Sequence, residues 1–157
     1  MASGKQHAIA TSIAAGVIGP LLVFGAGQSL DKALFCMLGC IIGLVITPDL
    51  EVRHRPIHSQ GIVRRTAGHR VAVIWFLLWL PYAYLIPYHR HWISHLPILG
   101  TTIRLVYLLV IPALLWYGLS CIFPLPALGV PPINSLLWWL FGGLAFVDIV
   151  HFIMDQI

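Results

Sequence analysis

The chain has 157 residues, of which 59% are hydrophobic and only 9% are charged, and its mean hydropathy is +0.91. Soluble domains carry about a quarter charged residues, so this composition excludes a soluble globular class and indicates an integral membrane protein. Apolar segments account for most of the length, and we therefore expect one transmembrane helical domain over residues 1–157. Nucleic acid is not an expected partner; the lipid bilayer is.

Five apolar segments follow one another along the chain, at about 8–27, 33–47, 71–87, 99–123 and 133–154. Several reach or approach the roughly 20 residues that a helix needs to span a hydrocarbon core. The first follows Lys5 but lacks a convincing A-x-A cleavage site, so we expect a retained helix and not a signal peptide. In the second, Cys36 and Cys40 are one helical turn apart, which favours packing over a disulfide or a zinc site.

A basic segment at about 48–70 separates the second and third apolar segments. Cytoplasmic loops concentrate lysine and arginine, so we expect a basic cytoplasmic loop here, and the N-terminus with Lys5 on the same side. Such a loop attracts anionic lipid first of all, and it could also hold a phosphorylated, lipid-like substrate. The five arginines of the segment are Arg53, Arg55, Arg64, Arg65 and Arg70.

The third apolar segment, 71–87, decides the topology because it is short, proline-containing and rich in aromatic residues. If it spans the bilayer, the histidines at 89–95 lie across the membrane from Asp49. If it is interfacial or re-entrant, all candidate ligands lie on the cytoplasmic face, and Arg104 snorkels to that face. Charge bias and ligand convergence favour an all-α integral membrane protein with about four transmembrane helices plus one interfacial or re-entrant segment.

Histidines and carboxylates gather at the expected ends of the apolar segments. Imidazole and carboxylate together form the ligand chemistry of Zn, Mn or Fe ions, so their convergence predicts a divalent metal site. Near the end of the last segment, Asp148, His151 and Asp155 fall within an arc of roughly 60° on one helix face. A face with these polar residues cannot point at lipid. The plainer alternatives are a buried Asp–His hydrogen bond and turn-capping acids. The candidates are His7, Asp49, Glu51, His89, His91, His95, Asp148, His151 and Asp155.

The string HRHWISH at 89–95 is the densest polar cluster. If it is helical, His91 and His95 are four residues apart and share one face. If it is irregular, His89 and His95 could both turn inward. Histidines at an interface can also simply solvate the headgroup region. We take His95 as the strongest candidate ligand of the three.

Three strings carry a resemblance: MASGKQH, ITPDLE and HRHWISHLPILGTTIRLVYL. They resemble a family of small bacterial, notably cyanobacterial, membrane proteins described as metal-binding, which is similar in pattern to inner-membrane-associated metal-dependent hydrolases. The resemblance implies a bacterial inner (plasma) membrane or thylakoid membrane. Two departures are Glu51, where the usual pattern has aspartate, and His91, where a small residue is expected. The implied site residues are His7, Asp49, Glu51, His89, Arg90, Ser94, His95, Asp148 and His151.

The leading hypothesis is a membrane-embedded metal-dependent hydrolase that cleaves a phosphoester or related bond of a membrane-associated substrate. Glu51 would act as general base and Arg90 would neutralise a phosphoryl group. The alternative is a non-catalytic metal-binding membrane subunit or assembly factor that docks a partner protein. Haem ligation ranks low because the expected core lacks paired mid-helix histidines. The expected metal ligands are His7, Asp49, His89, His95, Asp148, His151 and Asp155.

Overall fold

The computed structural model is entirely helical in the residues that it describes, 4–52, 57–88, 91–126 and 134–156. Four stretches are long and apolar enough to cross a membrane, and a fifth apolar helix is shorter, which confirms the expected fold class. The long stretches are Gly4–Gly25, Leu30–Glu51, Pro97–Ser120 and Ser135–Gln156. Their elements are α1 (Gly4–Pro20) with η1 (Leu21–Gly25), α2 (Leu30–Gly43) with η2 (Pro48–Glu51), α6 (Pro97–Ser120) and α7 (Ser135–Gln156).

Many large apolar side chains are not covered by protein. Phe24, Leu109 and Ile122 expose 87%, 72% and 74% of their surface, and each belongs to or directly follows a long apolar helix. Such an outer surface is unfavourable in water and suits contact with lipid. The exposed apolar faces and the four candidate spans indicate a membrane protein.

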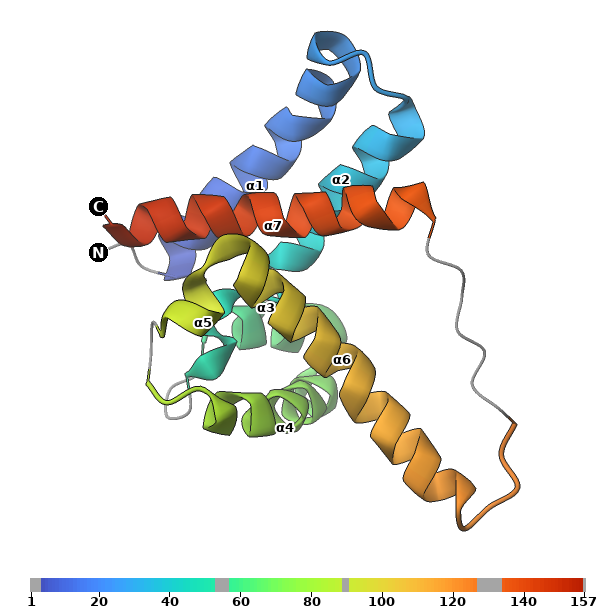
Figure 1. Cartoon of the computed structure of the whole chain (residues 1–157). Coiled ribbons are helices and arrows are strands. Elements are labelled where there is room, and N and C mark those ends of the chain that lie inside the picture. Colours follow the sequence, from blue (N-terminus) through green and yellow to red (C-terminus); the bar gives the residue numbers. More distant parts are fainter. Residues whose placement is uncertain (1–3, 53–56, 89–90, 127–133, 157) are drawn as a thin grey trace.

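Helix α7 connects the two sides of the molecule, since it packs against α1 and α2 and also against α6 (Figure 1). Small residues allow α2 and α7 to approach closely. A Cβ atom added to Gly39 would collide with the backbone of Leu140, and one added to Gly143 would collide with the backbone of Cys36. Cys40 is buried here and donates from Sγ to the Gly143 carbonyl at 3.4 Å. This is the small-residue packing that membrane helices favour.

The basic segment expected as a loop contains a helix of its own, α3 (His58–Ala67). Gly68 follows it with a φ of +89°, a left-handed conformation that favours glycine, and α4 (His69–Leu85) begins at once. Arg64, Arg65 and Arg70 are exposed, whereas residues 53–56 lie outside the described part of the chain.

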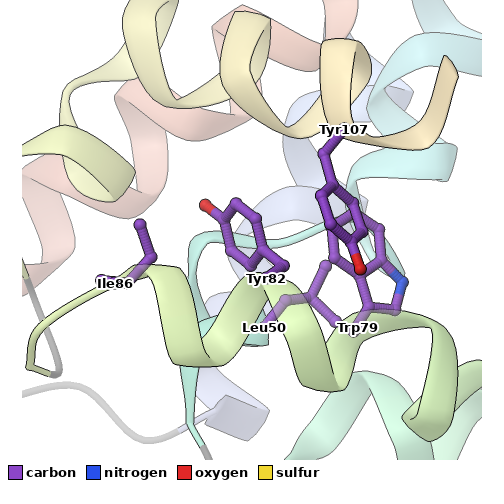
Figure 2. Packing of buried hydrophobic residues seen from close by; sticks show 5 residues of the cluster. All are labelled: Leu50, Trp79, Tyr82, Ile86 and Tyr107. Carbon is purple, nitrogen blue, oxygen red and sulfur yellow. The ribbon is translucent and has the colours of Figure 1, made fainter. Parts of the chain in front are cut away.

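Helix α4 has 17 residues, or about 25 Å of helix, which is short for a hydrocarbon core of about 30 Å. It packs against α3 and η2, and its aromatic residues meet α6. Figure 2 shows Trp79 and Tyr82 directed from α4 toward α6, with Tyr107 reaching down beside them. The ring centroids of Trp79 and Tyr107 are 5.4 Å apart, and the Tyr107 hydroxyl donates to the Leu78 carbonyl. This aromatic cluster fixes η2 and α6 relative to each other and so helps to position Asp49 and Glu51.

Candidate metal centre

Five of the predicted site residues meet at one place, although they come from four separate elements. Four elements contribute to it: the first turn of α1, the short η2, the four-residue α5 (Trp92–His95) and the last turns of α7. The start of α1 and the end of α7 both lie at this end of the molecule in Figure 1. Four of the five side chains are buried, and the fifth is 26% exposed. The residues are His7, Asp49, His95, His151 and Asp155, of which Asp49 is the partly exposed one.

The carboxylate of Asp155 faces three imidazole rings. Its Oδ1 lies 3.4 Å from Nε2 of His7, and its Oδ2 lies 3.4 Å from Nε2 of His151 and 3.6 Å from Nε2 of His95. Asp49 approaches the same group, with Oδ1 3.6 Å from Nε2 of His151. Three imidazole nitrogens are thus directed at two carboxylates.

These separations decide what the cluster can hold. They exceed the 2.7–3.2 Å that is usual for an N–H···O hydrogen bond. By contrast, two ligand atoms that each lie about 2.0–2.1 Å from a tetrahedral zinc ion are about 3.4 Å from each other. The ligand atoms of His7, His151 and Asp155, and those of Asp49, His95 and His151, all fall within 4.8 Å of one another in their groups. The buried His/Asp cluster could therefore hold a divalent metal ion.

The rings of His7 and His151 are stacked, with centroids 3.9 Å apart and planes inclined by 16°. Their Nε2 atoms approach different oxygens of the same carboxylate, Asp155. The stack and this carboxylate together join the start of α1 to the end of α7. Residues 144 positions apart in the sequence thereby contribute to the same centre.

His95 is held by its second ring nitrogen. Its Nδ1 lies 3.0 Å from Oγ of Ser94 and 3.6 Å from Oε1 of Glu51, while Ser94 Oγ donates to Glu51 Oε2. Metal-binding histidines usually donate the other ring N–H to a polar or carboxylate partner, which fixes the tautomer. A proton on Nδ1 of His95 would be donated toward Ser94 and Glu51, and the lone pair of Nε2 could then bind a metal ion at the centre.

A family comparison bears directly on this geometry. The model of a family described as "Uncharacterized metal-binding protein (DUF2227)" matches residues 2–141. The chain belongs to this family. The metal-binding part of the resemblance is thus confirmed, and the matched region includes His7, Asp49 and His95 but ends before His151 and Asp155. Comparisons with curated proteins and with solved structures gave no match.

Asp148 was expected as a ligand, but the structure does not bring it into either group of ligand atoms found among the described residues. It lies in a second buried network, where Thr101 Oγ1 and Arg104 Nη2 both donate to its Oδ2. Arg104 also donates from Nη1 to the Ser94 carbonyl at 3.0 Å. This network ties α6 and α7 to the residue that precedes His95.

Arg104 was expected to snorkel to the membrane surface, and that expectation is wrong. The side chain is only 1% exposed and pairs with Asp148 inside the protein. An arginine in an apolar helix requires either water or an internal counter-charge, and here the counter-charge is provided by the neighbouring helix. A lone basic residue at 104 and a lone acidic residue at 148, each within an apolar run, were the sequence signal for this pair.

The remaining predicted residues divide into two groups. His91 is the N-cap of α5, where its Nδ1 accepts from the Ile93 N–H at 3.2 Å. It precedes the helix, so the i, i+4 pair with His95, which required a helical string, does not form. His89 and Arg90 lie outside the described residues.

Glu51 was expected as a base, and its position leads to a first prediction. The Glu51→Gln variant keeps the side-chain size but removes the anion behind Ser94 and His95. We expect metal affinity to fall about 10- to 100-fold, as it does when such an outer partner is lost. Titration of the metal-free protein with zinc or manganese measures this. If Glu51 acted only as a base, metal affinity would be unchanged in this variant and turnover alone would fall.

Proposed function

We propose that the protein is a membrane-embedded metal-dependent hydrolase that cleaves a phosphoester or related bond of a membrane-associated substrate. The observation that supports this best is the set of three Nε2 atoms and two carboxylates at metal-ligand spacing. One or two divalent ions, Zn, Mn or Fe, would be held there. When bound, such an ion supplies a Lewis acid that activates water and polarises a phosphoryl oxygen.

Two spaces beside the cluster favour a reactive centre over a sealed one. A cavity of about 30 Å³ is lined by His7, Asp49 and His151, together with Thr47 and Ser59. It contains several polar groups and is large enough for a water molecule, which a hydrolysis needs as the nucleophile. Metal centres that do chemistry keep a position open, whereas structural zinc sites are closed by protein ligands.

The second space is a surface pocket of about 240 Å³ between α5 and the end of α7. His95 and Asp155 form part of its wall, and Trp92, Leu96 and Phe152 form an apolar rim. A substrate with an apolar tail could enter here and place its polar end beside two of the proposed ligands. Arg90 remains our candidate for neutralising a phosphoryl group.

We also propose that this end of the molecule faces the cytoplasm of a bacterial inner membrane or the corresponding side of a thylakoid. The exposed basic residues of α3 and α4 lie near the start of α1, at the same end as the cluster. Cytoplasmic segments carry an excess of lysine and arginine. Lys32, by contrast, lies in the first turn of α2, at the opposite end of that helix from η2.

The test is metal-dependent hydrolysis of phospholipids in detergent micelles, measured as inorganic phosphate released from phosphomonoester lipids and as the alcohol and phosphomonoester formed from phosphodiester lipids. We expect turnover in the metal-loaded protein, and more than a hundredfold less after chelation or in Asp155→Asn, since the activated water is lost. A protein that binds metal stoichiometrically, turns over none of these lipids and co-purifies with another protein would support the alternative, a non-catalytic subunit. The deep burial of His7, His95 and His151 is the observation that favours that alternative.

A further inference from the structure

A groove separate from the metal centre lies between the first turn of α1, helix α3 and the start of α4. Its volume is about 580 Å³. Four basic or titratable side chains from the three elements line it, and none of the lining residues that the structure describes is acidic. They are Lys5 of α1, His58 and Arg64 of α3, and His69 of α4.

The cations of this groove are available for a ligand. Lys5 and Arg64 are exposed, and among the described residues no carboxylate lies within ion-pair distance of either. Lys5 and Arg64 come from different helices and line the same groove, so one anion bound there would neutralise both charges. Phosphate oxygens accept charge-assisted hydrogen bonds from both lysine and arginine.

Part of the groove wall is apolar. Ile57 and Ala72 lie beside the cations, and Val73 and Phe76 continue along α4. Val73 leaves 42% of its surface uncovered by protein. A small soluble anion needs no such wall, whereas the glycerol and upper acyl chains of a lipid would cover it while the phosphate meets the cations.

Helix positions support a membrane-surface location for the groove. The apolar part of α4 begins directly after the basic α3, so the cations lie where an aqueous segment enters an apolar one. Anionic headgroups are concentrated at that depth, and juxtamembrane basic residues are attracted to them. We propose that this groove is a binding site for the phosphate headgroup of an anionic phospholipid, with Lys5 and Arg64 as its phosphate ligands.

The site is also close enough to affect the metal centre. Gly4 and His58 line both this groove and the small cavity beside His7, and a Cβ atom on Gly4 would lie only 3.1 Å from Cβ of His58. His7 follows Gly4 by one helical turn. A lipid bound to Lys5 and Arg64 would therefore hold the first turn of α1 against α3 and fix the helix that carries His7.

The experiment measures binding of dioleoyl phosphatidic acid to the full chain in detergent, by native mass spectrometry and by titration. The test variant is Lys5→Gln with Arg64→Gln. The matched control is Arg65→Gln with Arg70→Gln, which removes the same charge from exposed residues of α3 and α4 that do not line the groove. We expect affinity to fall by about tenfold or more in the test variant and by less than about threefold in the control.

Three results would overturn the proposal. Equal losses in the two double variants would mean diffuse attraction to a basic surface. Equal binding of uncharged dioleoylglycerol would mean an apolar groove that does not recognise phosphate. Displacement of the lipid by inorganic phosphate at comparable concentration would mean a soluble-anion site. Lipid binding is also measured with protein made metal-free by a chelator, so the result does not depend on any hydrolysis.

Discussion

Replacing Asp155 by asparagine should abolish tight metal binding. The two oxygens of this carboxylate face Nε2 of His7, His95 and His151, so the substitution removes the negative charge shared by three candidate ligands. Loss of an outer partner alone costs metal affinity 10- to 100-fold, and loss of a direct ligand should exceed about a hundredfold. Competition with a chromogenic chelator measures the affinity in detergent.

A matched control is available at the other end of the bundle. Asp31 is exposed in the first turn of α2, so Asp31→Asn changes the net charge of the protein equally without touching the cluster. We expect wild-type metal affinity in that variant. Unaltered affinity in Asp155→Asn, with the protein folded, would exclude Asp155 as a ligand.

Replacing Arg104 by methionine should be the most destabilising single change. Arg104 and Asp148 are both buried, and removing one member of such a pair leaves an uncompensated charge that typically costs 3–5 kcal/mol. We expect a loss of about that size in the free energy of unfolding, measured by denaturant titration in mixed micelles. Metal affinity should fall too, because Arg104 holds the Ser94 carbonyl beside His95.

The double variant Arg104→Met with Asp148→Leu separates charge from packing. An apolar pair of similar volume often restores or exceeds the stability of a buried ion pair, so we expect the double variant to be more stable than either single variant. Additive losses in the double variant would mean that the two side chains do not interact, contrary to the network described above.

The fold class was predictable because its signal is composition and segment length. Four of the apolar runs correspond to four helical stretches of at least 22 residues, and the short, proline-containing run corresponds to the 17-residue α4. The helix inside the basic segment was not predictable in the same way. Helix α3 has no acidic residue in its first turn and no side-chain cap, which are the usual signals of a helix start. Its packing against α4 and α1 depends on the tertiary structure.

The convergence of the site followed from topology, but its division into two networks did not. Helical periodicity places Asp148, His151 and Asp155 on one face, yet Asp148 and Asp155 are seven residues, or about 10 Å, apart along the axis. Asp155 reaches the histidines, whereas Asp148 reaches Arg104 and Thr101. The sequence shows which side of α7 each of these residues lies on. The partner that each one meets along the helix axis depends on how α6 packs against α7.

The histidines at 91 and 95 illustrate a second limit. A four-residue spacing suggests a shared helical face, but α5 begins only after His91, whose backbone is extended at φ −63° and ψ 137°. The short α5 ends at His95, and Pro97 starts α6 after the single extended residue Leu96. Helix boundaries of this kind, set by a cap and a proline, decide which histidine faces the metal centre.

The central claim is that segments from both ends of the chain form one metal centre, and elemental analysis of the purified protein tests it most directly. The protein would be prepared in mild detergent without chelator, alongside His95→Ala, His151→Ala and, as a control, His91→Asn, which keeps a good N-cap for α5. We predict near-stoichiometric Zn, Mn or Fe in the wild type and in His91→Asn, and loss of that metal in both alanine variants. A wild-type protein without metal, or His95→Ala and His151→Ala variants that retain it, would contradict the account.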